Sequence, residues 1–585
     1  MHVRHCRFIA VLLAALAIPA VSALDLGTLP VDTPQVTPSA PVSSYLHDVS
    51  QPIPGVSWMT GITEHHRITM ADGVELDAWI VRPDVAGPVP LVLELTPYYG
   101  GGDPTVTKPV SNAASYPYNI AIAAPFQELI KRGYAFGILS MRGTGASGGC
   151  FSIGGPQEAK DMATAIEYLA AQPWSNQAVG AMGVSYDGTA PQDLWVEAPP
   201  HLKTIVPISG ISDMYKYNYV NGVTIEDTRG FNTYYWLLDG MVPAGLEGGS
   251  QLLDPVTAPD AVIGEVCKER IDVTAEGFTS LVAGDKTPYW QARDHLAALK
   301  ADPSKKRASV FYIHGLQDWN VKPHNMEGWI EALQGSNVPF KAWLGQWDHA
   351  WPDRSDWITV MTAWFDQFLK NRNTGILDAP RVQVKDDAGK WRNEPRWPAT
   401  GKKVTLYPQV TGTLGTTQSV GFADYNDYSG QDVNETAPLP DDRVAFVTAP
   451  LANDLHLSGM PRFEGIVAST GARANLMLTL AEQLPDGTLR PFNFASLSLN
   501  HAESLAHGKP SVAGEPQYVG VNFYPQEDVV HAGNRLVLLA AGDLMFYGQP
   551  GPVMAPLATG SQIILDLASS KLVLPNDTTL SYEMP

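Results

Sequence analysis

The chain has 585 residues, which is too long for one ordinary domain and predicts two or three packed units. A hydrophobic fraction of 44% and a charged fraction of 17% are typical of a globular protein and exclude a disordered or fibrous chain. The formal net charge of −21 argues against nucleic acid as a partner, because phosphate binding requires a basic face.

The first 23 residues have the pattern of a secretory signal peptide. A basic start from His2 to Arg7 precedes an apolar run from Phe8 to Val21, and small residues end at Ala23, where cleavage is expected. The apolar run is about 14 residues long, shorter than the ~20 that a membrane span needs. We therefore expect a secreted or periplasmic protein with no membrane segment after cleavage, and the alternative is a retained anchor.

Two cysteines, Cys150 and Cys267, remain once the signal peptide is removed. In an exported protein an even pair is a candidate disulfide, and two free buried thiols are the alternative. A leader rich in Pro, Ser and Thr occupies residues 24–50.

Strand and helix signals alternate from about residue 51. Alternation of this kind predicts a mostly parallel sheet covered by helices on both faces. The expected helices are Pro125 to Lys131, closed by Gly133, and Glu158 to Ala171. The expected strands are Leu91 to Thr96, Tyr134 to Ser140, Ala178 to Val184, Thr204 to Ser209, Ala308 to His314 and Phe340 to Leu344.

The strand–helix rhythm is interrupted once and then replaced. Residues 215–294 are rich in Tyr, Trp, Gly and Asp and predict a cap inserted over the sheet, so the α/β domain comprises residues 51–214 and 295–378. Residues 379–585 carry short alternating runs between Gly, Pro and Asp turns and predict an all-β jelly-roll sandwich. The first of these runs is Arg381 to Val384.

A candidate nucleophile follows the strand Ala178 to Val184. Ser185 stands in the pattern Gly183-x-Ser-x-x-Gly188, at a tight turn before a helix candidate. A strained strand–turn–helix serine needs small neighbours so that the backbone can pass closely. Asp187 occupies the position where the commoner Gly-x-Ser-x-Gly pattern has its second glycine.

A serine hydroxyl needs a base, and the base needs an orienting acid. Asp318 follows the strand Ala308 to His314, and His349 follows the strand Phe340 to Leu344, in the order serine, acid, histidine that α/β-hydrolases use. Both fall at the carboxyl edge of a parallel sheet, where sites gather. His314 is the rival base and Asp348 the rival acid; His314 ends a strand, and Asp348 would have to turn back on its neighbour.

Several motifs together resemble the Xaa-Pro dipeptidyl-peptidase and cocaine-esterase-like serine hydrolases. These are Gly183-Val-Ser-Tyr-Asp-Gly188, Gln172-Pro-Trp-Ser-Asn176, Arg142-Gly-Thr-Gly-Ala-Ser147, Tyr289-Trp-Gln-Ala-Arg-Asp294, His314-Gly-Leu-Gln-Asp318 and Trp347-Asp-His349. The resemblance covers nearly the whole mature chain. It implies an α/β-hydrolase sheet with a helical cap and a C-terminal jelly roll.

The resemblance also implies site residues. Ser185 would be the nucleophile, Asp318 the acid and His349 the base, and the oxyanion hole would combine the hydroxyl of Tyr98 with the backbone N–H of Tyr186. Members that act on free amino groups bind them with carboxylates, for which Asp213, Glu226 and Asp227 are candidates. One departure is Ser140, where the family usually has an acid.

The sequence therefore predicts an Xaa-Pro dipeptidyl-peptidase that transfers an acyl group to water. A carboxylic-ester or α-amino-acid ester hydrolase is the alternative. A carbohydrate- or surface-binding protein with a degenerate hydrolase domain, using Trp391 and Trp397 as platforms, is the alternative of another class. We expect no metal and no cofactor, a small molecule or peptide as substrate, and a homo-oligomer as one possible state.

Overall fold

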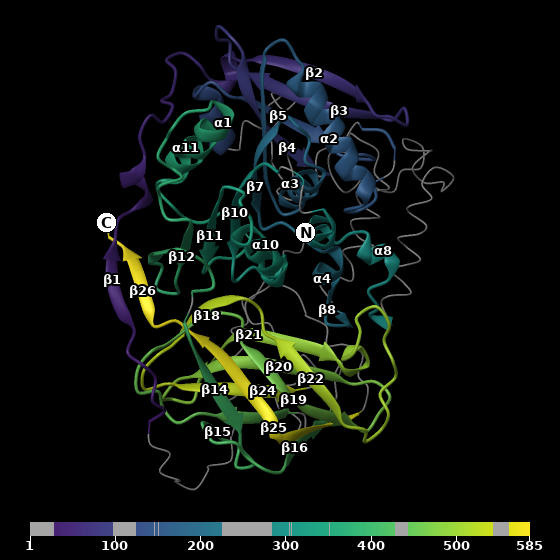
Figure 1. Ribbon diagram of the computed structural model, residues 1–585, viewed down its shortest axis with the longest axis vertical. Coiled ribbons are helices and arrows are strands. Elements are labelled where there is room, and N and C mark those ends of the chain that lie inside the picture. Colours follow the sequence, from purple (N-terminus) through teal and green to yellow (C-terminus); the bar gives the residue numbers. More distant parts are fainter. Residues whose placement is uncertain are drawn as a thin grey trace, which may run out of the picture.

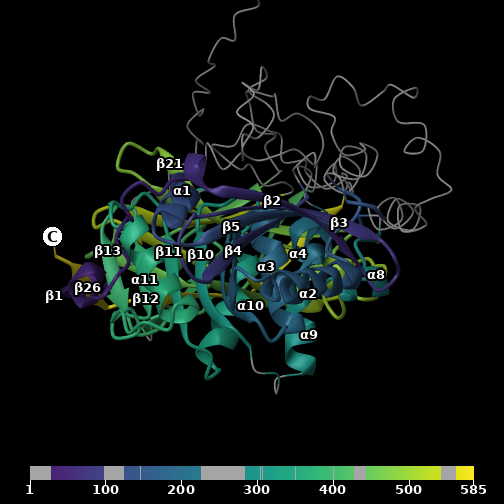
Figure 2. The ribbon, with the colours of Figure 1, turned by 90° about the horizontal axis from the view of Figure 1, so that it is seen from above.

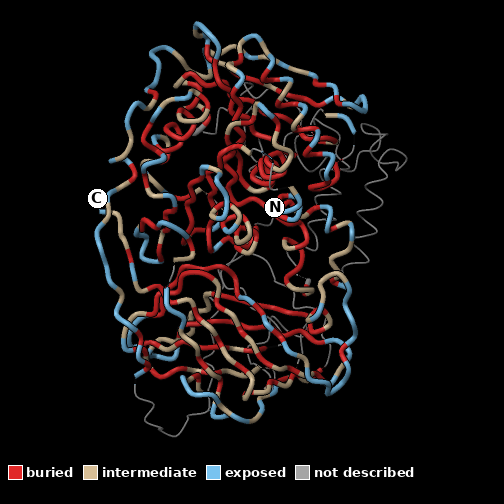
Figure 3. The backbone as a smooth tube through the Cα atoms, viewed as in Figure 1, coloured by how far each residue is buried: buried red, intermediate tan, exposed pale blue. Residues whose placement is uncertain are grey.

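The computed structural model describes residues 28–97, 124–144, 147–149, 151–224, 283–302, 305, 307–349, 351–399, 401–426, 443–541 and 561–584. Two bodies are evident: a large sheet flanked by helices, and an all-β part below it in Figure 1. Buried residues concentrate inside both bodies (Figure 3).

The large sheet has twelve strands in the order β1-β26-β13-β12-β11-β10-β7-β6-β4-β5-β3-β2. From β5 to β12 every neighbouring pair is parallel, as the sequence predicts. The strands are β1 (Gln35–Ser39), β2 (Ile62–Thr69), β3 (Glu75–Arg82), β4 (Val89–Thr96), β5 (Ala135–Ser140), β6 (Ser175–Val184), β7 (Leu202–Ile208), β10 (Ser309–Gly315), β11 (Phe340–Gly345), β12 (Val382–Lys385), β13 (Trp391–Glu394) and β26 (Thr579–Glu583).

Helices cover both faces of this sheet. Alternate residues of β4 divide between two apolar clusters, Leu91 and Leu93 on one face and Val92 on the other, because successive strand side chains point to opposite faces. Helices α2 (Pro156–Ala170), α3 (Tyr186–Glu197), α9 (His295–Ala301) and α10 (His324–Gln334) pack in the first cluster, and α1 (Ala124–Lys131) and α11 (Trp357–Leu369) in the second. Figure 2 shows α2, α3 and α9 together, away from α1 and α11.

The all-β part consists of two sheets, one of eight strands and one of four. It has its own apolar core. The larger sheet holds β14 (Lys402–Pro408), β15 (Leu414–Gly415), β16 (Phe422–Asn426), β18 (Leu455–Gly459), β19 (Arg462–Ser469), β22 (Gln517–Asn522), β23 (Gln526–Val530) and β25 (Gln562–Asn576). The smaller holds β17 (Arg443–Val447), β20 (Asn475–Gln483), β21 (Leu489–Ser498) and β24 (Arg535–Ala541).

The structure shifts the predicted boundary between these parts. The run Arg381 to Val384 was expected to open the β-sandwich, but β12 pairs in parallel with β11 and belongs to the large sheet. The final strand β26 also joins that sheet, and the leader contributes β1, which pairs with β26. A short alternating strand has the same sequence pattern whichever sheet it joins. The pattern alone therefore assigned β12 to the wrong sheet.

Only the two ends of the predicted cap lie in the described residues. They comprise α4 (Met214–Asn218), β8 (Tyr219–Val220), β9 (Val223–Thr224) and α8 (Pro288–Gln291). Tyr215, Tyr217 and Tyr219 are buried there, and the rings of Tyr215 and Tyr219 stack with centroids 4.9 Å apart. Three short 3₁₀ turns complete the described elements: Val42–Tyr45, Trp58–Thr60 and Leu499–His501. Within the described residues, we find no helix with the length and apolar character of a membrane span.

Candidate active site

Ser185 stands at a sharp turn between β6 and α3. Its φ of 65° and ψ of −125° place a non-glycine residue in a conformation that costs free energy and is typical of a nucleophile elbow. Backbone hydrogen bonds hold the turn on both sides. Ser185 N–H donates to the carbonyl of Ile208 at 3.0 Å, and the N–H groups of Gly188 and Thr189 donate to the carbonyl of Ser185, each at 2.9 Å.

The two glycines of the motif are required by close backbone approach. A Cβ on Gly183 would overlap Asp187, and a Cβ on Gly188 would overlap the carbonyl of Ile208. The second small residue of the elbow is thus needed three positions after Ser185, and Asp187 is accommodated at the position where glycine is commoner.

Asp318 and His349 lie at the same edge of the sheet as Ser185. They follow β10 and β11, two parallel neighbours, and β7 separates β10 from the strand that carries Ser185. His349 Nδ1–H donates to Asp318 Oδ2 at 2.7 Å, and Asp318 Oδ1 accepts from the backbone N–H groups of Asn320 and Val321 at 3.0 and 2.8 Å. The carboxylate is therefore held on both oxygens and fixes the orientation of the imidazole.

Burial and charge set the protonation of this pair. Burial alone would lower the pKa of His349, but the charge of Asp318 and its hydrogen bond outweigh burial and raise it. Burial would raise the pKa of Asp318, but the charge and hydrogen bond of His349 lower it. Asp318 is fully buried, whereas the side chain of His349 is 23% exposed. This is the arrangement of an oriented general base.

The rival residues occupy different surroundings. His314 is fully buried, its Nε2–H donates to the carbonyl of Val321 at 2.8 Å, and burial lowers its pKa, so it is a neutral structural histidine. Asp348 is exposed, and the acid that accepts the hydrogen bond from Nδ1–H of His349 is Asp318.

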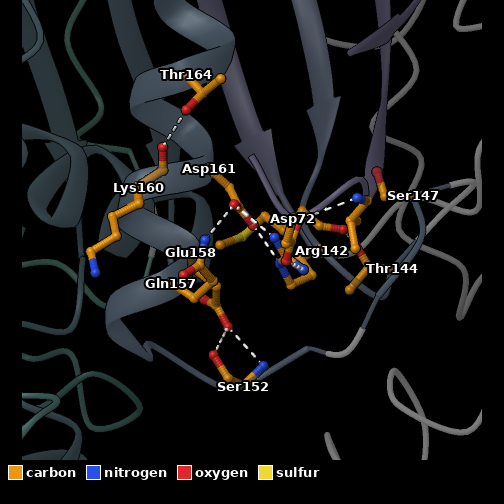
Figure 4. Close-up of polar contacts among 12 residues, drawn as sticks. Asp72, Arg142, Thr144, Ser147, Ser152, Gln157, Glu158, Lys160, Asp161 and Thr164 are labelled. Carbon is orange, nitrogen blue, oxygen red and sulfur yellow. Dashed lines mark hydrogen bonds and ion pairs between the residues drawn. The ribbon is translucent and has the colours of Figure 1, made fainter. Parts of the chain in front are cut away.

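Tyr186, directly after Ser185, is anchored through its side chain. Its hydroxyl donates to Glu158 Oε2 at 2.9 Å, and burial together with the charge of Glu158 keeps the pKa of the phenol well above its ordinary value. Glu158 also accepts from the backbone N–H and the hydroxyl of Ser152, both at 2.8 Å (Figure 4). The first residue of α3 is thereby fixed to α2 and to the loop before it.

Arg142 organises the other end of that loop. Its guanidinium contacts both oxygens of Asp161 at 2.5 and 2.9 Å and Asp72 at 2.8 Å (Figure 4). At Ser140, where an acid is usual in the resembled family, the backbone carbonyl accepts a hydrogen bond from the hydroxyl of Ser147 at 2.6 Å. Arg142 and Ser147 therefore help to hold the loop beside α2.

The all-β part reaches the loop that carries Asp318. The ring of Trp319 lies 5.4 Å from that of Phe494 and 5.8 Å from that of Tyr524, and His324 stacks on Tyr524 at 5.0 Å. These contacts connect the two domains beside the candidate acid. No sequence pattern predicted them, because the residues concerned are about 175 to 205 positions apart.

Asp213 is already engaged by a cation of the chain itself. Lys286 Nζ donates to Asp213 Oδ2 at 2.6 Å and to Asp294 Oδ2 at 2.7 Å, and Asp213 Oδ1 accepts from Tyr215 N–H as the cap of α4. Its carboxylate is buried and paired, so the geometry does not support the predicted role of Asp213 in binding a substrate amino group.

The remaining predicted residues lie outside the described part of the chain. They are the oxyanion candidate Tyr98, the amino-binding candidates Glu226 and Asp227, and the cysteines Cys150 and Cys267. The described residues contain no group of three or more side chains suited to hold a metal ion.

Trp391 and Trp397 are packed rather than displayed. Trp397 is buried, with its indole N–H directed to Glu527 at 3.3 Å, and Trp391 packs against Trp343 and Trp347 with the guanidinium of Arg354 over its ring at 4.3 Å. These contacts do not support the use of the two rings as sugar-binding platforms, which was one of the two grounds for the carbohydrate-binding alternative.

Comparison with known proteins identifies the chain. Residues 72–351 match the family model X-Pro dipeptidyl-peptidase (S15 family), and residues 374–564 match the X-Pro dipeptidyl-peptidase C-terminal non-catalytic domain. The chain belongs to the X-Pro dipeptidyl-peptidase family. The resemblance drawn from the motifs is confirmed, and the protein is a hydrolase.

Individual relatives agree with this family assignment, and solved structures agree with the fold. The chain is 27% identical to a putative Xaa-Pro dipeptidyl-peptidase of Streptomyces avermitilis over 92% of this chain and 85% of that protein, and 27% identical to one of Bacillus anthracis over 80% of each. An α-amino acid ester hydrolase superposes with a TM-score of 0.68 at 20% identity, over 88% of this chain and 97% of the other. A CocE/NonD family hydrolase of Staphylococcus aureus gives 0.70 at 18%, over 88% and 94%. The predicted α/β-hydrolase fold with a C-terminal all-β domain is confirmed.

Proposed function

We propose that the protein is a serine hydrolase in which Ser185, His349 and Asp318 form and hydrolyse an acyl-enzyme. The observation that carries this proposal is the 2.7 Å hydrogen bond between His349 Nδ1 and Asp318 Oδ2, at the sheet edge where Ser185 occupies a strained elbow. An imidazole oriented by a buried carboxylate is the base that a serine hydroxyl requires.

The chemistry follows from these positions. Ser185 Oγ attacks a substrate carbonyl carbon while His349 Nε2 takes the hydroxyl proton, and Asp318 stabilises the imidazolium that forms. The imidazolium returns the proton to the leaving group. Water, deprotonated by the same histidine, then attacks the ester carbon and releases the acid and Ser185.

The developing oxyanion needs donors. The N–H of Tyr186 directly follows the nucleophile and stands at the start of helix α3, where the helix dipole favours negative charge. We assign the oxyanion hole to this N–H and to the hydroxyl of Tyr98. Anchoring of the Tyr186 side chain on Glu158 supports the first assignment, because it fixes the backbone at that position.

We propose that the physiological substrate is a peptide cleaved after an Xaa-Pro dipeptide. Support comes from the two family models and from the printed names of the relatives. We place recognition of the free amino group on Glu226 and Asp227, since Asp213 is neutralised by Lys286.

An ester hydrolase is the second candidate. The α-amino acid ester hydrolase and the CocE/NonD hydrolase share the fold over most of their length, and the engaged state of Asp213 removes one of three carboxylates that a free-amine peptidase could use. We further propose that the protein is exported by the segment of residues 1–23 and works without a metal or cofactor.

One experiment separates these candidates. Residues 24–585 are assayed with Gly-Pro-p-nitroanilide, with its N-blocked form and with p-nitrophenyl butyrate. Rapid cleavage of the free-amine amide, lost on blocking, would support the dipeptidyl-peptidase. Cleavage of the ester alone would support the esterase and discard the peptidase assignment.

The control is Ser185→Ala, which should remove turnover of all three compounds and labelling by a fluorophosphonate. Full activity of Ser185→Ala toward any of the three substrates would contradict the proposed mechanism.

A further inference from the structure

Two carboxyl side chains are buried beside the elbow of Ser185. Glu94 is the one acid in the otherwise apolar strand β4 and is 3% exposed, and Asp187, in the first turn of α3, is 1% exposed. The two side chains are hydrogen-bonded to each other, and the side chain of Thr96 is hydrogen-bonded to Asp187. The mechanism above uses neither acid.

The pair lies where two central strands part. The ladder between β4 and β6 ends at Leu93 and Ala181, although β4 continues to Thr96 and β6 to Val184. Ser185 follows this unpaired end directly. Asp187 makes its contacts with β4 in just this interval, so side chains connect the elbow to β4 where the backbone ladder no longer does.

This connection depends on protons. Two carboxylates in a dry interior repel each other, whereas a protonated carboxyl donates a hydrogen bond to its neighbour. Burial raises the pKa of Glu94 to about 8, and burial followed by the charge of Glu94 raises that of Asp187 well above its usual range. One Asp187 oxygen, Oδ1, has no hydrogen-bond partner, so an ionised pair would be poorly compensated.

Other ionisable groups around α3 and the sheet pair among themselves. Across α3, Glu158 is bonded to Tyr186 and Asp193 contacts His295; beyond the opposite face of the sheet, Asp366 on α11 is bonded to Tyr134. In the described residues the only ionisable group acting on Glu94 is Asp187, and the only one acting on Asp187 is Glu94.

We propose that Glu94 and Asp187 are positioning residues for Ser185, whose proton-bearing carboxyl pair holds the first turn of α3 against β4. This inference rests on the proposed role of Ser185 as nucleophile. Loss of the pair's proton separates α3 from β4 and displaces the serine and the adjacent N–H of Tyr186, so the reaction slows while substrate binding is largely kept.

The test measures the rate of fluorophosphonate labelling of Ser185, and kcat and KM for p-nitrophenyl butyrate, from pH 6 to 10. Glu94 titrates first, and its charge raises the pKa of Asp187, so the pair loses its last proton at a pH above 8. In the unmodified protein the labelling rate and kcat should fall with that loss, about tenfold for each further pH unit, with little change in KM. The variant Glu94→Gln/Asp187→Asn keeps the shape and a hydrogen bond without an ionisable group. Its rate should stay level to pH 10.

A matched control is Asp528→Asn, which removes a buried acid of raised pKa, about 7, in the all-β part. It should keep the alkaline fall of the unmodified protein. Equal alkaline falls in the unmodified protein and the double amide would overturn the proposal. So would a level rate in the unmodified protein, a result that requires no variant to fold. Absence of Ser185 labelling at every pH would instead reject the proposed mechanism.

Discussion

The imidazole of His349 and the carboxylate of Asp318 meet at 2.7 Å although they come from loops after two different strands. A second bond, from the backbone N–H of Gln317 to the carbonyl of Trp347 at 3.1 Å, ties the same two loops together. The pair is therefore set by the sheet itself, since β10 and β11 are parallel neighbours in register from Val310 and Phe340 onward.

Asp318→Asn should lower kcat about 10³–10⁴-fold, because the amide cannot hold the imidazole in the required tautomer. The pH profile should also move. His349 must be neutral to act as base, and Asp318 raises its pKa above 6.5, so activity is lost as the pH falls through that raised value. Without Asp318 the acid limb of kcat/KM should shift to lower pH.

The control for this shift is Asp348→Asn. Asp348 also raises the pKa of His349, but it makes no hydrogen bond to that ring in the described structure. It should move the acid limb slightly and leave kcat within a few fold. A kcat for Asp318→Asn similar to that of Asp348→Asn would exclude Asp318 as the orienting acid.

Tyr524→Leu should lower kcat up to about tenfold, because Trp319, next to Asp318, loses its ring contact with Tyr524 of the all-β part. An aromatic pair of this kind is worth about 0.5–1.5 kcal/mol beyond its buried area. Tyr518→Leu is the matched control, since Tyr518 is 63% exposed in the same part of the chain. Steady-state kinetics of both variants test this, and equal activities would show that the C-terminal contact does not support the acid loop.

Asp213→Asn should reduce the free energy of unfolding by about 1–3 kcal/mol, because Lys286 keeps only Asp294 as a charged partner. It should leave unchanged the ratio of KM values for free-amine and N-blocked substrates. Urea unfolding and the two KM values measure these effects. A rise in KM for the free-amine substrate alone would show that Asp213 does bind the amino group of the substrate.

Replacing Glu94 and Asp187 by amides should change how stability depends on pH. Burial raises the pKa of Glu94 from 4.5 to about 8, so between these values the folded protein binds more protons than the unfolded chain. The free energy of unfolding of the unmodified protein therefore falls as the pH rises across that window. Relative to it, the double amide should gain on the order of 3 kcal/mol from pH 5 to pH 8 from the loss of Glu94 alone, and the loss of Asp187, whose pKa is also raised, adds to this gain. Parallel unfolding curves at the two pH values would contradict this.

The fold and the candidate triad were largely predictable because their signals are local. Buried strands such as β4 and β10, and the glycines around Ser185, impose a pattern on consecutive residues. The strand before Asp318 and the strand before His349 have the same character, so a parallel sheet brings their following loops to one edge.

The features that sequence reasoning missed depend on distant partners. Lys286 neutralises Asp213 from 73 positions away, and Trp319 meets Tyr524 across two domains. Glu94 did leave a local signal, as an acid in an apolar strand, but its partner Asp187 could be recognised only once β4 and α3 were placed side by side.

The pairing of β1 with β26 has a consequence for how the protein forms. Residues 35–39 and 579–583 lie side by side in one edge of the large sheet (Figure 1), and β26 also pairs with β13. That edge cannot be assembled until β26 has been synthesised, and β26 follows all the strands of the all-β part in the chain, so the hydrolase body finishes after those strands have been made. Deleting β26 should leave β13 as an open edge and expose a template for aggregation.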